Sequence, residues 1–182
     1  MGLMIKDSTQ NWFAAYTHSC QEKRVTQQLS TRNIEVFLPV HRTIRHWKNG
    51  LHVQIERPLF PGYVFVKAHR EDKVRILGAP GVHSIVGVGR EPSPLPYEEI
   101  EALRRGARLL NLEPHQYLNA GEKVLIRKGP LEGMTGFVIR QKNSVRVVLS
   151  IDLIMKSMSV EVDLEDLEVV GQLGSTHEYA CL

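Results

Sequence analysis

The sequence has few of the features that mark membrane, secreted or disulfide-linked proteins. No apolar run approaches the roughly 20 residues needed to span a bilayer, and residues 1–10 have neither the apolar core nor the cleavage site of a signal peptide. Its two cysteines, Cys20 and Cys181, lie far apart and outside any CxxC pair, so we expect two ordinary thiols. The simplest interpretation is a cytoplasmic protein.

Catalytic and metal-binding patterns are also missing. The HExxH, GxSxG, P-loop, GxGxxG and CxxC signatures are all absent. Eight histidines are present, but His41, His46 and His52 do not share a ligand-like spacing. We therefore expect a binding protein with no catalytic residues, no metal site and no cofactor.

Charge is unevenly distributed along the 182 residues, whose net charge is +3. Residues 1–110 carry 16 basic and 10 acidic side chains, whereas residues 111–182 carry 7 and 10. This asymmetry favours two units with different partners. The basic unit is a candidate for nucleic-acid contact, and a solvated basic surface would give the same pattern.

Alternating apolar and polar segments predict an α+β unit over residues 11–108. Trp12–Thr17 has the composition of a buried strand. Ser19 with Glu22 forms a capping box that predicts a helix start, and Val25 and Leu29 give that helix an apolar stripe. Further strands are predicted at 34–47, 52–56, 63–66 and 82–88, and further helices at 71–77 and from 96 through 107. This order indicates an α/β sandwich with a mostly antiparallel sheet.

The pattern changes after residue 108. Residues 109–119 show no period and are predicted to be a linker. Short β-rich runs then recur through residues 120–170, separated by turn residues, and predict a small all-β barrel. Residues 171–182 are polar and are predicted to form a flexible tail.

Two groups of motifs carry a family resemblance. The segment VLIRKGPLEGMTGFV at 124–138, with turn residues Gly129, Pro130, Gly133 and Gly136, resembles a KOW motif of SH3-like barrels. WFAAYT at 12–17, RPLFPGYVFV at 57–66 and GV at 81–82 resemble the amino-terminal (NGN) domain of the NusG family. Residues 45–48, 89–96 and 149–163 resemble operon-selective antiterminators of the UpxY and RfaH kind. A housekeeping NusG-type factor and a ribosome- or RNA-associated KOW protein remain alternatives.

The resemblance implies a transcription elongation and antitermination factor that binds RNA polymerase and suppresses pausing or termination. In the family the amino-terminal domain docks on the β′ clamp helices, and the matching positions here are Tyr16 and Phe60. Phe13 and Leu59 are expected in the core or behind this pocket. Contact with the β subunit is expected near Lys73 and Arg75.

Nucleic-acid contact is expected at two places. Specialised relatives read the non-template DNA strand, and the matching surface comprises His18, Arg24, Gln28, Thr31 and Arg32. The basic hairpin over residues 42–57, with Arg45 and Lys48, is a second electrostatic candidate. A polar solvated surface would explain either pattern equally well.

For the barrel, the family offers ribosomal protein S10, the termination factor Rho, or RNA as partners. In one relative this domain refolds into a helical hairpin. Residues 145–151 and 157–162 are rich in β-branched side chains, so we expect a stable barrel here. We also expect a monomer.

Overall fold

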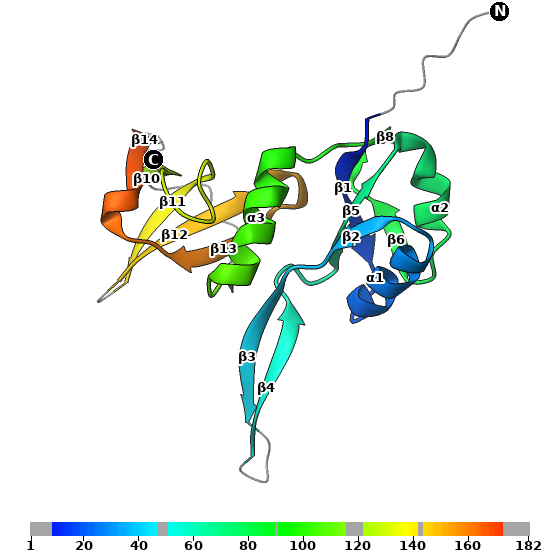
Figure 1. Ribbon diagram of the computed structural model, residues 1–182, viewed down its shortest axis with the longest axis horizontal. Coiled ribbons are helices and arrows are strands. Elements are labelled where there is room, and N and C mark those ends of the chain that lie inside the picture. The colour runs from blue at the N-terminus through cyan, green and yellow to red at the C-terminus, as the bar shows by residue number, and fades with distance from the viewer. Residues whose placement is uncertain (1–8, 47–50, 90, 116–121, 142–143, 173–182) are drawn as a thin grey trace, which may run out of the picture.

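A four-stranded antiparallel sheet organises the first half of the protein. The computed structural model describes residues 9–46, 51–89, 91–115, 122–141 and 144–172 (Figure 1). The strand order is β2-β5-β1-β6, comprising β1 (Asn11–Thr17), β2 (Glu35–Phe37), β5 (Tyr63–Ala68) and β6 (Val82–Ile85). All neighbouring strands pair antiparallel, as expected from the sequence.

The two faces of this sheet pack against different helices. Phe13 and Ala15 of β1 belong to a cluster with Val25 and Leu29, the predicted apolar stripe of α1 (Glu22–Thr31). Alternate residues of β1 belong to a second cluster, which includes the buried face of α3 (Tyr97–Leu109). The period-two alternation of the strand therefore divides the core into two layers.

The start of α1 corrects one expectation. The helix begins at Glu22, and its N-cap residue Gln21 makes no side-chain cap hydrogen bond, so the predicted capping box with Ser19 is wrong. Instead, Glu22 Oε1 accepts a hydrogen bond from the backbone N–H of Gly62 at 2.8 Å. Glu22 thus satisfies a turn donor that lies 40 residues later in the chain.

Cation–π contacts of one arginine on helix α3 help to hold the helix to the sheet. The guanidinium carbon of Arg104 lies 4.9 Å from the ring centre of Trp12 and 5.4 Å from that of Phe37. Arg104 also forms an ion pair with Glu35 at 2.9 Å. Such cation–π contacts contribute most where the ring and cation are partly desolvated, as they are at this packed face.

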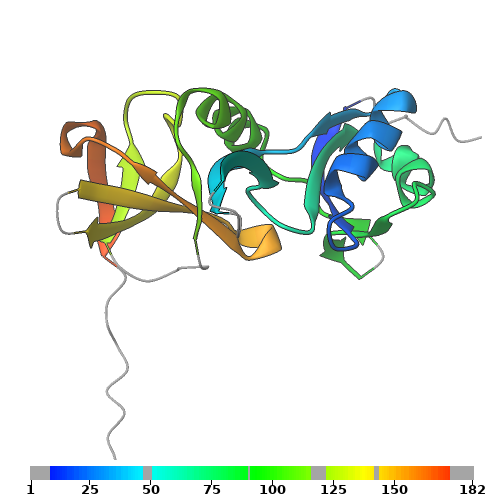
Figure 2. The ribbon, with the colours of Figure 1, turned by 90° about the horizontal axis from the view of Figure 1, so that it is seen from below.

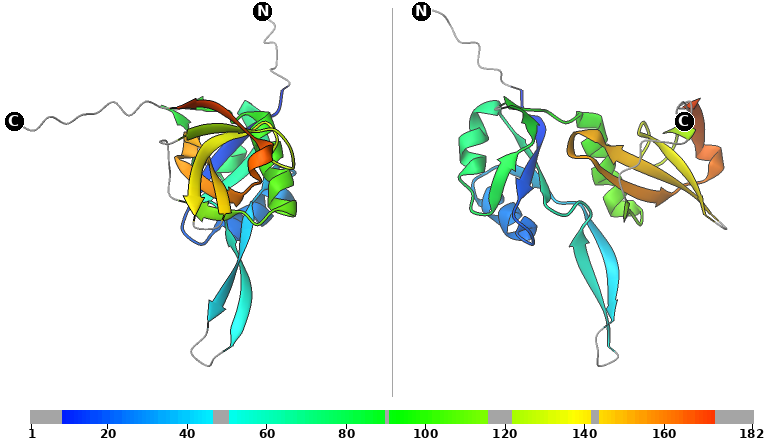
Figure 3. Two further views of the ribbon diagram at one scale, coloured as in Figure 1. Left: turned by 90° about the vertical axis from the view of Figure 1, so that its left-hand side faces the viewer. Right: turned by 180° about the vertical axis from the view of Figure 1, so that it is seen from behind.

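A two-stranded ribbon and smaller elements complete the first half. The ribbon pairs β3 (Val40–His46) with β4 (His52–Pro58) and projects away from the rest of the protein (Figures 1 and 3). The predicted turn at 48–50 lies outside the described residues. The smaller elements are α2 (Lys73–Leu77), preceded by a 3₁₀ turn at Arg70–Asp72, and the short pair β7 (Gly87–Val88) and β8 (Glu91–Pro92).

The second half is a six-stranded antiparallel sheet that forms the expected small barrel. Its order is β14-β10-β11-β12-β13-β9. The strands are β9 (Glu113–His115), β10 (Glu122–Ile126), β11 (Thr135–Gln141), β12 (Ser144–Ile151), β13 (Lys156–Glu161) and β14 (Leu167–Gln172). Strand β9 lies inside the predicted linker and pairs with β13, so part of that segment belongs to the barrel sheet. A 3₁₀ turn at Asp152–Ile154 joins β12 to β13.

The two halves contact each other through α3. The helix lies between the amino-terminal sheet and the barrel (Figures 1 and 2). A Cβ placed on Gly106 would lie 2.5 Å from Leu131 Cδ2, so any larger residue here would require the Leu131 side chain to shift. Arg105 Nε donates to the carbonyl of Pro130 at 3.2 Å. Among the helices that the structure describes, none is long and apolar enough to cross a membrane.

Candidate functional site

An exposed row of aromatic and imidazole rings crosses the end of β1. The row comprises Tyr63, Tyr16, His83 and His18, with successive ring centres 5.3, 5.5 and 5.7 Å apart. Tyr16 is 41% exposed, which is unusual for an aromatic residue in a central strand. We call these four residues the aromatic row.

Strand register and two glycine turns, at Gly62 and at Gly81, assemble the aromatic row. Tyr16 pairs with Tyr63 on β5 and with Ser84 on β6. Gly62 adopts a positive φ of 85°, and a Cβ there would lie 3.2 Å from the ring of Tyr16. Burial, with a smaller contribution from Tyr16, raises the pKa of the Tyr63 phenol. A tyrosine phenol with its ordinary pKa of 10 is already protonated at neutral pH, so this upward shift leaves Tyr63 a hydrogen-bond donor.

The structure brings together two residues that the sequence assigned to different partners. Tyr16 was predicted to contact polymerase and His18 to contact DNA, yet His83 bridges their rings. Sequence reasoning missed His83, because only the pairing of β1 with β6 brings it here. A single histidine in a strand carries no signal of such a position.

Phe60 is not on the surface of this structure. It is 1% exposed, and its ring meets that of Phe65 edge-on with centres 6.0 Å apart. Phe60, which the resemblance places at the polymerase contact, is therefore buried in this arrangement. The turn that it begins is still coupled to the aromatic row, since the Tyr63 N–H donates to the Phe60 carbonyl at 3.1 Å.

Phe13 and Leu59 lie in the core, as expected, but in different layers. Phe13 packs with the α1 side of the sheet. Leu59 belongs to the cluster that holds Phe60, the buried face of α3 and residues of the barrel such as Ile154. This continuous cluster crosses from one half of the protein to the other.

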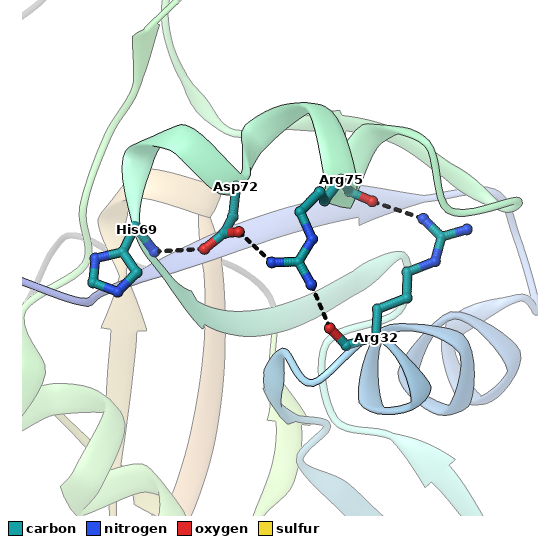
Figure 4. A network of polar contacts seen from close by, with 4 residues as sticks. All are labelled: Arg32, His69, Asp72 and Arg75. Carbon is teal, nitrogen blue, oxygen red and sulfur yellow. Dashed lines mark hydrogen bonds and ion pairs between the residues drawn. The ribbon is translucent and has the colours of Figure 1, made fainter.

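Two predicted contact arginines fasten α1 to α2 (Figure 4). Arg75 donates to the Arg32 carbonyl at 2.6 Å, and Arg32 donates in return to the carbonyls of Arg75 at 2.7 Å and Gly78 at 3.1 Å. Asp72 accepts from Arg75 at 2.6 Å and from the backbone of His69 at 3.2 Å. We call Arg32, Arg75 and Asp72 the helix clasp.

The helix clasp satisfies backbone carbonyls that helix ends otherwise leave without partners. Each arginine caps the end of the other's helix, which also suits the negative end of the helix dipole. Lys73, the other predicted β-subunit contact, starts α2 and is followed by Val74, which is 78% exposed. The surface of α2 beside the clasp therefore combines a cation with an exposed aliphatic side chain.

The remaining nucleic-acid candidates are dispersed. Arg24 and Thr31 are exposed on α1, Gln28 is half-buried, and the Thr31 hydroxyl donates to the Gln28 carbonyl at 2.8 Å. Arg45 lies on the ribbon, away from α1 (Figure 3). Lys48 lies outside the described residues.

The KOW residues form the turn that faces α3. Gly129 and Gly133 both adopt positive φ, at 94° and 86°, a conformation that favours glycine. Gly136 enters β11 where a Cβ would lie 2.4 Å from the carbonyl of Val148. Pro130 supplies the carbonyl that accepts from Arg105. These positions have the backbone roles expected from the motif.

Comparison with known proteins decides the family. Residues 10–104 match the family described as "NusG: Transcription termination factor nusG". The chain belongs to the NusG family. It is therefore a transcription factor and not an enzyme, and in the part of the chain that the structure describes no group of three His, Cys, Asp or Glu side chains could hold a metal ion.

Curated relatives of this NusG-family chain match along nearly their whole length. The transcription termination/antitermination protein NusG of Deinococcus radiodurans is 28% identical over 185 residues, covering 86% of this chain and 97% of the relative. The protein of that name from Lactococcus lactis is 28% identical over 173 residues, covering 87% and 92%.

A solved structure supports the two-part fold. The structure titled "Domain interaction in Thermotoga maritima NusG" aligns with a TM-score of 0.55 at 22% identity. The alignment covers 90% of this chain and 98% of that one. The mixed α/β sandwich followed by a small β barrel is thus a fold shared with that protein.

Proposed function

We propose that this NusG-family chain is an elongation and antitermination factor that binds RNA polymerase at the β′ clamp helices and suppresses pausing or termination in an operon-selective way. The observation that carries the proposal is the aromatic row. It combines a 41%-exposed tyrosine at a family contact position with a rigid surround of β strands and glycine turns.

The chemistry of the row suits a protein partner with apolar helices. Tyrosines contribute large rigid contact area with little loss of side-chain entropy, and they are enriched among interface residues whose truncation costs about 2 kcal/mol or more. Tyr16 already packs against Tyr63 and His83. Little ordering remains to be done when a partner binds.

Phe60 supports this contact from behind in our proposal. Its backbone carbonyl holds Tyr63, and its ring is buried against Phe65. Direct contact between Phe60 and polymerase would require the hydrophobic cluster between sheet and barrel to open. We therefore assign the direct contact to Tyr16.

Two further contacts belong to the proposal. The half-buried Lys73 and the exposed Val74 on α2 are assigned to the β subunit, and the helix clasp with Arg75 holds α2 in position for this contact. His18 and Arg24 are assigned to the non-template DNA strand, since both are exposed near the start of α1. Operon selectivity is supported by the resemblance to specialised paralogs.

The test compares Tyr16→Ala with Tyr97→Ala, which removes a tyrosine on α3 that is 52% exposed. Binding to bacterial core RNA polymerase and escape from a defined pause are measured on the same samples. We expect Tyr16→Ala to weaken binding by roughly 30-fold, the equivalent of about 2 kcal/mol, and to slow pause escape at subsaturating protein. Tyr97→Ala should behave as wild type.

Two outcomes would overturn the proposal. If Tyr16→Ala and Tyr97→Ala bind equally well, the aromatic row is not the docking surface. If the wild-type protein does not bind core polymerase at micromolar concentration, the polymerase assignment fails. The ribosome- or RNA-associated alternative would then be tested with purified ribosomes.

A further inference from the structure

A tight turn joins the buried Phe60 to the aromatic row. The Tyr63 N–H donates to the Phe60 carbonyl at 3.1 Å and closes a turn over residues 60–63. The two central residues are Pro61 and Gly62, and Gly62 has a φ of 85°. Proline in the first central position and a positive φ in the second define a type II turn.

Type II and type I turns differ in the orientation of their central peptide. Conversion of one into the other rotates that peptide by roughly 150–170°, while the closing hydrogen bond can remain. Here the central peptide joins Pro61 to Gly62, and its N–H belongs to Gly62. The closing hydrogen bond therefore leaves this orientation open, and a second contact can fix it.

Glu22 supplies such a contact from another part of the chain. Its Oε1 atom accepts a hydrogen bond from the Gly62 N–H at 2.8 Å, and Glu22 is the first residue of α1. The residue is only 5% exposed. A carboxylate in the first turn of a helix lies at the positive end of the helix dipole, which is favourable there. Glu22 thus holds the Pro61–Gly62 peptide in the type II orientation.

That orientation places Gly62 directly against Tyr16. The Gly62 carbonyl accepts a hydrogen bond from the Thr17 N–H at 2.8 Å. A Cβ on Gly62 would lie 3.2 Å from Cε2 of Tyr16, so the glycine backbone packs closely on this ring. The contact runs from Glu22 through the turn to the exposed tyrosine of the aromatic row.

We infer that Glu22 is a positioning residue for the docking contact of Tyr16. The inference rests on the proposed function, because it concerns the same contact with polymerase. Glu22 is buried and acts through the orientation of the Pro61–Gly62 peptide. Without this carboxylate the Gly62 N–H loses its acceptor. Leaving a buried donor without a partner is costly, which favours rotation of the peptide and a changed support for the Tyr16 ring.

The test uses three substitutions of Glu22 in the full chain. Glu22→Ala removes the acceptor. Glu22→Asp keeps a carboxylate at the helix start but is one methylene shorter, which draws the carboxylate back from Gly62. Glu22→Gln keeps an oxygen acceptor at the same length. The control is Thr26→Ala, which removes a hydroxyl of the same helix that donates to the Glu22 carbonyl at 2.8 Å, within the helix itself.

The first measurement needs no polymerase. Hydrogen exchange of the Gly62 amide and nuclear Overhauser contacts between Gly62 and the Tyr16 ring are followed by NMR. We expect roughly tenfold faster exchange in Glu22→Ala and Glu22→Asp, with weaker contacts to the ring. Glu22→Gln should restore both properties, and Thr26→Ala should change neither. If Glu22→Ala does not fold, Glu22→Asp provides the same comparison.

The second measurement is binding to bacterial core RNA polymerase, under conditions in which every variant is folded. We expect Glu22→Ala and Glu22→Asp to weaken binding roughly three- to tenfold, less than Tyr16→Ala does, and Glu22→Gln to bind as wild type does. In a chain that already carries Tyr16→Ala, Glu22→Ala should weaken binding no further. A role in folding alone would not depend on Tyr16.

Failure of this inference is distinguishable from failure of the proposed function. If Tyr16→Ala binds as wild type does, the docking surface is wrong and both proposals fail. If Tyr16→Ala weakens binding but Glu22→Ala binds as Thr26→Ala does, only the role of Glu22 fails. Equal losses from Glu22→Ala with and without Tyr16→Ala, or unchanged Gly62 exchange in Glu22→Ala and Glu22→Asp, would also overturn that role.

Discussion

Two antiparallel strand pairs in this protein have nearly the same hydrogen-bond ladder and opposite surroundings. The pair β1–β5 is matched over six residue pairs and buried on both faces, whereas the ribbon β3–β4 is matched over seven and solvated on both. Backbone pairing is therefore not what distinguishes them. The side chains determine which pair is buried, since aromatic and aliphatic residues fill the first pair and arginines and histidines occur along the second.

The comparison separates stability from recognition. Burial of apolar area is the main favourable contribution to folding, so the β1–β5 pair and its two helical layers should account for most of the stability of the first half. The ribbon contributes little of this kind, because an isolated two-stranded pair is marginal in water. Its sequence is free to serve a binding partner.

The largest expected effect tests this contrast directly. Phe65→Ala in β5 should lower the free energy of unfolding by about 3–5 kcal/mol, because it leaves a cavity between Phe37 and Phe60. Ile44→Ala in the ribbon should change it by less than about 0.5 kcal/mol. Urea denaturation of both variants is the measurement. Similar losses of unfolding free energy in the two variants would show that the ribbon contributes as much to stability as the sheet core does.

A second test concerns the contact between α3 and the barrel, which we rank below the sheet core. Glycine to alanine in a helix interior normally gains about 1 kcal/mol. At Gly106 we expect instead a loss of about 1–3 kcal/mol from the domain contact, because the added methyl meets Leu131. Small-angle scattering and nuclear Overhauser contacts between α3 and the barrel measure how far the two halves separate. Adding Leu131→Ala to the Gly106→Ala variant should remove the clash and restore the contact between α3 and the barrel.

The control for this contact is Arg108→Ala, an exposed position on the same helix. This substitution raises helix propensity little and leaves the Gly106–Leu131 contact unchanged. Unchanged scattering for Gly106→Ala would mean that Leu131 moves aside without cost. The contact with Leu131 would then not explain why residue 106 is a glycine.

Sequence reasoning predicted the elements better than the contacts between them. Periodicity located the apolar stripe of Val25 and Leu29, and both are buried. The KOW glycines were predicted to serve turns, and Gly129 and Gly133 have the required positive φ. These features depend on neighbours within a few residues, which is the range over which patterns carry information.

The missed features all join distant segments. Glu22 had the spacing of a capping box but bonds to Gly62, and Phe60 had the position of a contact residue but is buried. The row that joins His18 to Tyr16 requires His83 from another strand. Spacing along the chain cannot show which distant segment a side chain contacts after folding.

A third test compares the contribution of the helix clasp to stability with the contributions of the packed contacts above. Arg75→Ala removes the helix clasp and should cost about 1 kcal/mol, as expected for hydrogen bonds near the surface. Arg32→Ala should cost a similar amount. Because the two arginines cap each other's helices, the double variant should lose less than the sum of the singles.

The result that contradicts the clasp is strict additivity. Arg24→Ala is the matched control, since it removes an exposed arginine from the same helix α1. Hydrogen exchange of α2 amides provides an independent measure. Faster exchange in Arg75→Ala but not in Arg24→Ala would tie the clasp to the order of α2, the helix assigned to the second polymerase contact.

The smallest expected effect concerns one carboxylate at the domain contact. Burial, and then the charges of Asp152 and Glu98, raise the pKa of Glu99 on α3. Its folded-state pKa thus exceeds the unfolded value, so the folded chain binds more protons and stability falls as pH rises through that range. At neutral pH the full penalty is present, and below the ordinary carboxyl pKa near 4.5 it is gone. Asp152 belongs to the barrel, so its part of the penalty acts between the two halves.

Glu99→Gln imitates the protonated side chain and should therefore stabilise the protein slightly at pH 7.5, by up to about 0.5 kcal/mol. The gain should vanish at pH 4, where Glu99 in the wild type is already protonated. Urea unfolding at both pH values measures this, with Glu71→Gln, which removes an exposed carboxylate outside α3, as the control. A gain that persists at pH 4, or a loss at pH 7.5, would show that Glu99 makes a favourable contact as a carboxylate. The contact between α3 and the barrel would then be held by charge as well as by the fit of Leu131 against Gly106.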